Sequence, residues 1–276
     1  MGIVNVTPDS FSDGYNGHFI DQAIEHAQVL LDQGADILDI GGESTRPGAI
    51  PVPAQEEKRR VVTVIRALAQ MTQRPLSVDT SKPLVMDAAV AAGARMINDV
   101  RALRTPGALT AAARLGVPVV LMHMQGEPAT MQRAPTYTDV VSEVLDFLGH
   151  RIGAAVSAGI DFANLIIDPG FGFGKTTAHN FALLAGLERF QRLNVPILVG
   201  LSRKRSLGEV TGRQEPKARV FASVAAHLIA VQRGASIVRV HDVGATKDAL
   251  QVWNAVHAFD RLPTDGHGAG HIADAN

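Results

Sequence analysis

The chain has 276 residues, of which 46% are hydrophobic, so it is long enough to bury a large core within one domain. Its formal net charge of −1 excludes the strongly basic surface by which many proteins bind nucleic acid or an anionic membrane. It has no cysteine, which excludes disulfides, thiolate zinc sites and thiol nucleophiles. No apolar run reaches the ~18 residues of a membrane span and no signal-peptide pattern opens the chain, so we expect a cytoplasmic protein.

Short apolar runs recur along the chain. Each ends in a polar residue and is followed by a loop rich in Gly or Pro and then by an amphipathic stretch. The runs are rich in Val, Ile and Leu and are apolar on both faces, as strands buried on both sides of a parallel sheet are. In chain order they are IVNV, ADILDIGG, LSVDTS, RMINDV, VPVVLMHM, LIIDPG, VPILVGLS and SIVRVHDV.

The stretches between these runs predict helices. Residues 19–33 and 137–158 each carry an apolar stripe at helical spacing. The second stripe consists of Val140, Val141, Val144, Leu145, Leu148, Ile152 and Val156. Eight alternations of strand and helix predict an α/β fold, a single (β/α)8 TIM barrel over residues 1–261. A doubly wound open sheet is the alternative. Residues 262–276 lack apolar periodicity and predict a flexible C-terminal tail.

Polar residues stand at the carboxyl ends of almost all the predicted strands, where barrels of this kind place their active sites. Residues two apart share one face of a strand. Asp79, Asn98 and Asp168 could therefore meet inside the barrel mouth, and Arg239 and His241 could converge on one anion. The full set is Asn5, Asp39, Asp79, Asn98, Asp99, His123, Asp168, Ser202, Lys204, Arg239 and His241.

Two carboxylates and an amide suit two kinds of ligand. They can accept hydrogen bonds from, and donate one to, a flat heterocycle that bears ring N–H and amino groups and a carbonyl. They can equally hold a divalent metal ion. The three side chains alone leave both readings open.

The glycine-rich segment DPGFGFGKT looks like a nucleotide-binding loop. A P-loop needs four residues between its first Gly and its Gly-Lys pair, whereas only three separate Gly170 from Gly174. We therefore expect a tight turn after a strand, on which Phe171 and Phe173 could present an aromatic wall to a ring.

Two histidines at strand ends raise the possibility of a hydrolytic metal site. His123 and His241 stand on different predicted strands, and the chain has no H-x-H or H-E-x-x-H pattern. A zinc hydrolase is disfavoured, and we expect His123 to be a hydrogen-bonding core residue.

Taken together, the motifs resemble the signature segments of the dihydropteroate synthase family, in that family's order. They cover residues 2 to about 243, and the two long N-terminal segments together with GFGFGK are the most specific. The segments are GIVNVTPDSFSDG, DIGGESTRPGA, SVDTSKP, INDV, LMHMQG, DPGFGFGKT, GLSRK and VRVHDV.

The resemblance implies an enzyme of folate biosynthesis with its active site at the carboxyl ends of the barrel strands. Such an enzyme is a transferase of alkyl or aryl groups other than methyl. It condenses (7,8-dihydropterin-6-yl)methyl diphosphate with 4-aminobenzoate to give 7,8-dihydropteroate and diphosphate. We expect a dissociative, SN1-like path, because an electron-rich dihydropterin can stabilise a methylene cation and an aromatic amine is already neutral at pH 7.

The resemblance also implies which residues bind each part of the substrates. The pterin would be held by Asp79, Asn98, Met122, Asp168, Gly200 and Lys204. The diphosphate would be held by Asn5, Arg239 and His241, with Mg²⁺ bridging Asn5 and the diphosphate. The aminobenzoate would contact Phe11, Thr45, Arg46, Pro47, Phe173 and Ser202. Lys204, Arg239 and His241 would act on the leaving diphosphate, and Asp13 would stabilise the cation.

Further implications concern assembly and inhibition. The family usually forms homodimers, for which Ala225, Leu228 and Val231 on the late predicted helices could face either a partner or the core. Sulfonamides, which are aminobenzoate analogues, are expected to bind. The family usually has a hairpin that closes the barrel floor before the segment MGIVNV, so either the numbering begins at an internal methionine or the floor is closed differently.

Two rival activities share parts of this pattern. Methyltetrahydrofolate:corrinoid methyltransferases have a similar pterin pocket, but they hold no diphosphate and should not need RVH, SRK and STRPG together. A non-catalytic pterin-binding protein would be expected to lack loop residues or diphosphate ligands, and none is missing here.

Overall fold

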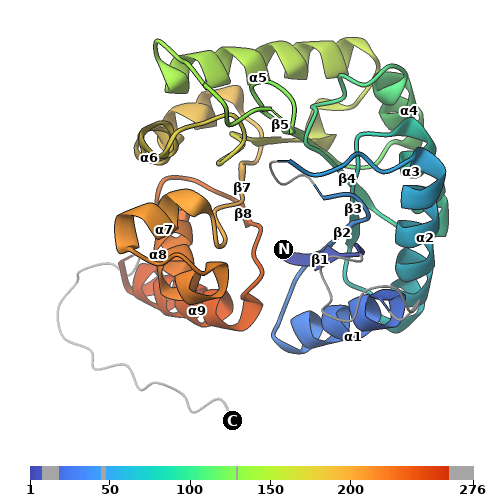
Figure 1. Ribbon diagram of the computed structural model, residues 1–276, viewed down its shortest axis with the longest axis horizontal. Coiled ribbons are helices and arrows are strands. Elements are labelled where there is room, and N and C mark those ends of the chain that lie inside the picture. Colours follow the sequence, from blue (N-terminus) through green and yellow to red (C-terminus); the bar gives the residue numbers. More distant parts are fainter. Residues whose placement is uncertain (8–18, 45–47, 129, 261–276) are drawn as a thin grey trace.

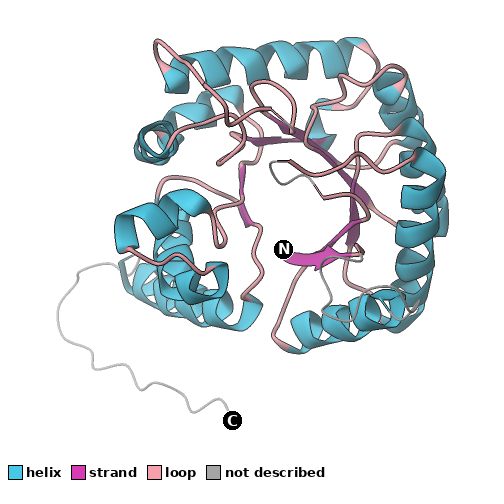
Figure 2. Ribbon diagram, viewed as in Figure 1, coloured by secondary structure: helices cyan, strands magenta, loops and turns pink. Residues whose placement is uncertain are grey.

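The computed structural model describes residues 1–7, 19–44, 48–128 and 130–260. Within them, a ring of parallel strands lies inside a ring of helices, as Figures 1 and 2 show in end-on view. The single (β/α)8 barrel predicted from the sequence is therefore confirmed. The predicted tail, residues 262–276, and two of the predicted site loops, 8–18 and 45–47, lie outside the described residues.

Each of the eight apolar runs supplies one strand. Strands β1 to β6 pair in parallel in chain order, and β7 pairs with β8. Bridges from Ile167 to Ile197 and from Gly2 to Val240 join these two sheets and close the barrel, which excludes the open sheet. The strands are β1 (Gly2–Asn5), β2 (Leu38–Gly41), β3 (Leu76–Asp79), β4 (Met96–Asp99), β5 (Val119–Met122), β6 (Leu165–Asp168), β7 (Leu198–Val199) and β8 (Ile237–Val238).

Helices cover the outside of the ring. The described α-helices are α1 (Phe19–Asp32), α2 (Ala54–Met71), α3 (Pro83–Ala92), α4 (Ala108–Leu115), α5 (Val140–Ser157), α6 (Thr177–Ala185), α7 (Arg205–Thr211), α8 (Val220–Gln232) and α9 (Val243–Asp260). Three 3-10 helices, η2 (Phe162–Asn164), η3 (Leu187–Leu193) and η4 (Pro216–Arg219), precede β6, β7 and α8. None of the described helices is long and apolar enough to cross a membrane.

The helix predicted over 137–158 differs from the observed α5 at both ends. It begins at Val140, because the Asp139 carboxylate accepts hydrogen bonds from the amides of Val141 and Ser142 and so caps the helix. The predicted apolar stripe was wrong at Val156, whose side chain is exposed, and Ala155 packs in the core instead.

Strand side chains alternate between two surroundings. Outward-facing residues such as Val4, Val78 and Ile167 pack against the helices in the main core. An inward-facing apolar layer, which includes Met96 and Ile166, fills the barrel. Two residues further along the same strands, the inward-facing residues become polar, and these side chains surround the cavity described next.

Candidate active site

A cavity of about 1720 Å³ opens at the carboxyl ends of the strands, which is more than one drug-sized ligand usually needs. Every residue that the family resemblance assigns to the site, and that the structure describes, lines this cavity. These residues are Asn5, Asp79, Asn98, Met122, Asp168, Phe173, Gly200, Ser202, Lys204, Arg239 and His241. The other predicted contacts, Phe11, Asp13, Thr45, Arg46 and Pro47, lie outside the described residues.

Two carboxyl groups and an amide line the inner part of the cavity. Asp79 is opposite Asn98 in the β3–β4 register, and Asp168 is opposite Met122 in the β5–β6 register. Burial raises the pKa of Asp168 to about 6, although its carboxylate accepts a 2.7 Å hydrogen bond from the Gly170 amide. Burial also raises the pKa of Asp79. A ligand that donates N–H groups to these side chains would stabilise their ionised forms.

The guanidinium of Arg239 lies between two carboxylates inside the barrel. Its Nε donates to Asp39 Oδ2 at 2.6 Å and its Nη2 donates to Asp79 Oδ2 at 3.0 Å. Asp39 is fully buried and also accepts from Asn98 Nδ2 at 3.0 Å. Buried carboxylates therefore hold two of the Arg239 nitrogens, and both Arg239 and His241 line the cavity, where their predicted convergence on one anion stays a prediction.

His241 pairs with the turn that follows β7. The Ser202 hydroxyl lies 2.9 Å from His241 Nδ1 and accepts from the His241 amide at 3.1 Å. Burial, together with the charges of Arg203 and Arg239, lowers the pKa of His241 to about 3, so the imidazole is neutral at pH 7. His241 can therefore donate a hydrogen bond to an anion but adds no full positive charge.

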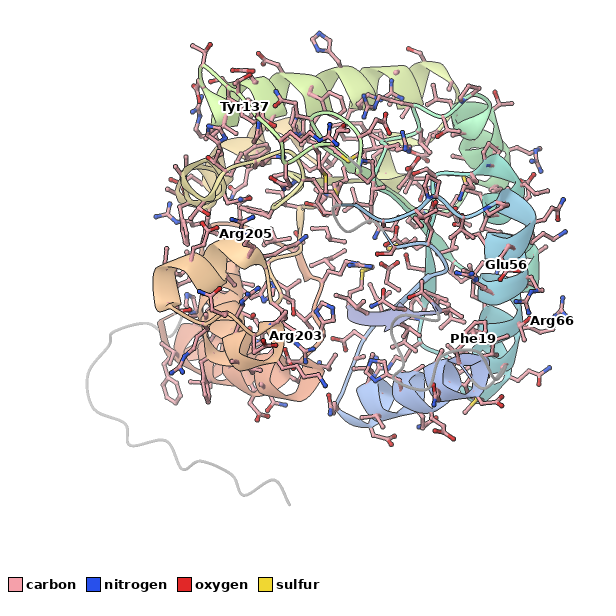
Figure 3. The ribbon with its side chains drawn as sticks, viewed as in Figure 1. Phe19, Glu56, Arg66, Tyr137, Arg203 and Arg205 are labelled. Atoms are coloured by element: carbon pink, nitrogen blue, oxygen red, sulfur yellow. The ribbon has the colours of Figure 1, made fainter. Side chains whose placement is uncertain are left out.

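Cationic side chains gather on the β7–β8 side of the cavity. Lys204 Nζ lies 4.4 Å from the centre of the Phe173 ring. Arg203, which the sequence analysis did not single out, lines the cavity and donates to both carboxylate oxygens of Asp242, at 2.9 and 2.5 Å. Arg203 belongs to the region of α7 and α8 and is labelled in Figure 3. This side of the cavity suits an anionic group, whereas the β3–β6 side suits N–H donors.

An apolar wall adjoins the polar groups. Phe173 packs against a cluster formed by Val100, Met122, Met124 and Met131, a flat surface on which an aromatic ring can stack. Phe171 is 1% exposed and packs in the main core. Of the predicted aromatic pair, Phe173 therefore provides most of the wall.

Lys175 holds the turn that carries Phe173, and the sequence analysis missed it. Its buried Nζ donates to Gly170 O at 2.9 Å, to Phe173 O at 3.0 Å and to His123 Nδ1 at 2.8 Å. A Cβ at Gly170, where φ is +71°, would lie 1.8 Å from His123 O, so only glycine fits. A lysine that closes a glycine-rich turn without P-loop spacing was the available signal, because such a turn leaves carbonyl groups that need donors.

Three of the polar strand-end residues do not line the cavity. His123 is buried and accepts from Lys175, as the prediction of a core role requires. Asp99 faces the helices and accepts from the amides of Arg101 and Leu103, each at 2.8 Å. Asp39 lies within the barrel, where it binds Asn98 and Arg239.

The described residues include no group of three or more His, Cys, Asp or Glu side chains that could hold a metal ion. Asn5 brings one amide side chain to the cavity. Mg²⁺ commonly binds through one or two protein oxygens together with substrate phosphates and water. The Asn5 carbonyl therefore fits a metal that arrives with a diphosphate.

Comparisons with known proteins agree with this geometry. The family model of pterin binding enzymes matches residues 1–241. Dihydropteroate synthase of Escherichia coli (strain K12) is 50% identical over 255 residues, which cover 92% of this chain and 90% of that protein. Xanthomonas albilineans dihydropteroate synthase, solved with 4-aminobenzoic acid, is 63% identical with a TM-score of 0.90, covering 95% of this chain and 93% of that one.

A second solved structure supports the same relationship. It is the dihydropteroate synthase from Xanthomonas albilineans in complex with 7,8-dihydropteroate, which is 60% identical with a TM-score of 0.87 and covers 95% of this chain and 94% of that one. The chain therefore belongs to the dihydropteroate synthase family of pterin-binding transferases.

Proposed function

We propose that this protein condenses (7,8-dihydropterin-6-yl)methyl diphosphate with 4-aminobenzoate to give 7,8-dihydropteroate and diphosphate. The observation that carries the proposal is one cavity with carboxyl groups on its β3–β6 side and cations on its β7–β8 side. The two Xanthomonas albilineans structures contain one proposed substrate, 4-aminobenzoic acid, and the proposed product.

The pterin ring occupies the inner part of the cavity in this proposal. Asp79 and Asp168 accept hydrogen bonds from its ring N–H and amino groups, and Asn98 supplies both a donor and an acceptor. Met122 packs against the ring. Gly200 has no side chain, so the ring can approach the backbone at this position. Lys204 binds the ring carbonyl from the β7 side.

The diphosphate lies toward β1, β7 and β8. Arg239 uses Nε and Nη2 for carboxylates inside the barrel, so Nη1 is the group that we propose for the diphosphate. Neutral His241 donates one hydrogen bond, and Lys204 supplies a full charge. Asn5 would hold Mg²⁺, which when bound adds positive charge beside the leaving group.

The charge arrangement favours a dissociative reaction. Negative charge accumulates on the departing diphosphate, where Lys204 and Arg239 stabilise it in a site with little water. Positive charge remains on the pterin methylene, near Asp79 and Asp168. Asp13 on the first loop is our candidate for stabilising this cation. Water must be kept from the cation until the amine attacks, because hydrolysis would compete.

The aminobenzoate binds at the outer part of the cavity. Phe173 provides the stacking surface, and Ser202 contributes hydrogen-bonding capacity beyond its contact with His241. Phe11, Thr45, Arg46 and Pro47 complete the pocket in this proposal, and sulfonamides would occupy the same place. Arg46→Ala should then weaken aminobenzoate binding with little effect on pterin binding, and an unchanged KM for aminobenzoate would refute the placement of Arg46.

A direct assay tests the proposed reaction. The purified protein would be mixed with the dihydropterin diphosphate, 4-aminobenzoate and Mg²⁺, and dihydropteroate and diphosphate would be followed together. We expect equal amounts of both products, and none after the metal is chelated. Pterin binding without either product would contradict the proposal and favour a methyltransferase or a binding protein.

We also propose that the protein is a cytoplasmic homodimer. Exposed apolar side chains gather on α7, α8 and α9, which lie together on one side of the barrel (Figure 1), namely Val210, Phe221, Ile229, Val252, Val256 and Phe259. Of the residues considered from the sequence, Ala225 is exposed, whereas Leu228 and Val231 are half-buried. Sedimentation should give twice the chain mass, and Phe221→Asp should reduce it to one chain. A wild-type monomer at micromolar concentration would contradict the homodimer.

A further inference from the structure

The turn that carries Ser202 and Lys204 has an unusual backbone. It runs from Leu201 to Lys204 directly after β7, and Arg203 within it has φ +58°. A residue that has a side chain is strained in this left-handed conformation, because its Cβ comes too close to the following carbonyl oxygen. Such a conformation persists only where contacts with surrounding groups fix it.

Three side chains that lie outside the cavity lining bind the backbone of this turn. The Leu201 amide donates to His227 Nε2 at 3.1 Å, and the Arg203 amide donates to Ser223 Oγ at 2.9 Å. Arg219 Nη1 donates to Arg203 O at 2.9 Å. Both backbone groups of the strained residue are therefore satisfied by side chains.

Arg219, Ser223 and His227 are spaced four residues apart, from the end of η4 along α8. Residues at this spacing share one face of a helix. All three are buried. The face they form, which we call the α8 bracket, lies directly against the turn.

Each member of the α8 bracket is itself held in the state that it needs. The Ser223 hydroxyl donates its hydrogen to Arg219 O at 2.7 Å, so its oxygen accepts from Arg203. Burial lowers the pKa of His227 to about 4, so the imidazole is neutral at pH 7, and the hydrogen bond that the Leu201 amide donates places the lone pair on Nε2. Arg219 Nε donates to Arg213 O at 2.9 Å, which orients its guanidinium.

Gly208 on α7 makes room for Arg219. A Cβ at Gly208 would lie 2.4 Å from Arg219 Nε and 2.5 Å from Arg213 O. Glycine within a helix normally lowers the stability of the helix relative to alanine. Its presence here therefore has a packing reason, the close passage of the Arg219 side chain.

We propose that Arg219, Ser223 and His227 are positioning residues for the transferase reaction, which hold the turn from Leu201 to Lys204 so that Lys204 and Ser202 reach the substrates. None of the three lines the cavity, so they act through the turn. The inference rests on the proposed function, because it assigns the bracket to the step in which Lys204 acts on the leaving diphosphate.

The first test compares turnover in variants of the α8 bracket. Ser223→Ala removes the acceptor of the Arg203 amide and should lower kcat by about 10-fold, because the turn no longer holds Lys204 in place. His227→Leu should act similarly, and His227→Gln, which places an acceptor near the Nε2 position, should recover most of the activity. Thr211→Val is the matched control, because the Thr211 hydroxyl bonds only Leu207 O in its own helix, and it should leave kcat unchanged.

A double-mutant cycle separates positioning from a general structural role. If Ser223 acts through Lys204, Ser223→Ala should lower kcat about 10-fold in the wild type and have almost no further effect in a Lys204→Ala background. An equal decrease in both backgrounds would overturn the inference, because it would mean a loss of folded protein. Should Ser223→Ala fail to fold, Gly208→Ala displaces Arg219 instead and serves in the same cycle.

The proposed function and this inference fail in different ways. If the wild-type protein makes no dihydropteroate, the proposed function is wrong. If it does, and neither Ser223→Ala nor His227→Leu changes kcat, the proposed function stands and the positioning role of the α8 bracket is wrong.

Discussion

The two arcs of the barrel place their functional side chains by different means. From β1 to β6 the strands are four residues long and pair continuously, and the end of each strand is held by its neighbours. At β7 and β8 the strands are two residues long, and single bridges join them to the rest of the barrel. There the turn after the strand is fixed by side chains from α8, and Arg203 is tied to Asp242.

This difference corresponds to a division of labour in the proposed reaction. The pterin side needs fixed acceptors, and Asp79, Asn98 and Asp168 sit on the continuous ladder. The diphosphate side needs cations at the mouth of the cavity, where the ladder has already ended. Hydrogen bonds from helix side chains fix the backbone beyond the ends of the strands. This matters because displacing a catalytic group by about 1 Å can lower the reaction rate ~10²-fold.

The largest expected effect comes from the arc formed by β7 and β8, which we call the bracketed arc because the α8 bracket holds the turn after β7. Lys204→Ala should lower kcat by ~10²-fold or more, the scale observed when one charge-stabilising donor is removed from an active site. The melting temperature should stay close to that of the wild type, because Lys204 is a half-buried residue at the cavity. Near-normal turnover would remove Lys204 from the mechanism and leave the diphosphate role to Arg239 and His241.

On the arc from β1 to β6, which we call the ladder arc because its strands pair continuously, Asp168→Asn should weaken pterin binding by about 10- to 100-fold. Hydrogen bonds to a charged group contribute about 1.5–3 kcal/mol. Isothermal titration with a pterin would measure this loss. Because the β5–β6 ladder holds the backbone, the neighbouring residues should not move, and aminobenzoate contacts at Phe173 should persist. A loss of both ligands would mean that the ladder does not isolate its strand ends.

Asp168→Asn should also stabilise the ligand-free protein at high pH. The folded-state pKa of Asp168 is about 6, above the ordinary value near 4, so the folded state binds the proton more tightly than the unfolded state does. The contribution of Asp168 to the free energy of unfolding of the wild type therefore falls as pH rises from about 4 to about 6. Asp168→Asn should gain on the order of 1–3 kcal/mol at pH 8, and the gain should disappear below about pH 4. A gain that does not change with pH would contradict the assignment.

A smaller effect is expected at the turn after β6. This turn follows a strand of the continuous ladder, and the Lys175 side chain also holds it by hydrogen bonds. Lys175→Met leaves Gly170 O and Phe173 O without their donor, and the KM for aminobenzoate should rise by about 10-fold because Phe173 is less well placed. The affinity for the pterin should change less. An unchanged KM would mean that glycine geometry alone shapes this turn.

Lys175 also provides a pH signature. Burial lowers its pKa to about 7, so between about pH 7 and about pH 10 the folded state has lost a proton that the unfolded state keeps. The wild type should therefore gain stability relative to Lys175→Met as pH rises through this range. Chemical denaturation at pH 6.5 and pH 9.5 would measure the change, and a stability difference that does not change between these pH values would show that Lys175 stays charged in the folded state.

The ladder arc was the more predictable part of the molecule. Alternation along a strand has a period of two, so the sequence alone indicated that Asp79, Asn98 and Asp168 share the inner face. It did not indicate the partners of Arg239, because the carboxylates of Asp39 and Asp79 lie 200 and 160 residues away along the chain. Favourable charge pairing across such separations has no local pattern.

The bracketed arc was less predictable for a similar reason. The spacing of Arg219, Ser223 and His227 was visible in the sequence, but the same spacing is typical of any buried helix face. Their partners are backbone groups of a turn 16 to 26 residues earlier, and a backbone group carries no sequence signal. The motif SRK indicated that the turn matters, whereas the residues that hold it had no motif of their own.

The smallest expected effect tests the comparison directly, by hydrogen exchange in the ligand-free protein. Amides in β4 and β5 lie in a ladder that continues on both sides, whereas the Arg239 amide depends on one bond to Val199 O at 2.9 Å in a two-residue pair. The opening free energy of β7 and β8 should be lower by about 1 kcal/mol or more, the net contribution of one or two hydrogen bonds. Ser223→Ala should widen this gap, because it frees the turn that ends β7, while leaving exchange from β4 to β6 unchanged. Equal protection of both arcs in the wild type would mean that side-chain brackets stabilise a strand end as well as a ladder does, and the two arcs would then open as one unit.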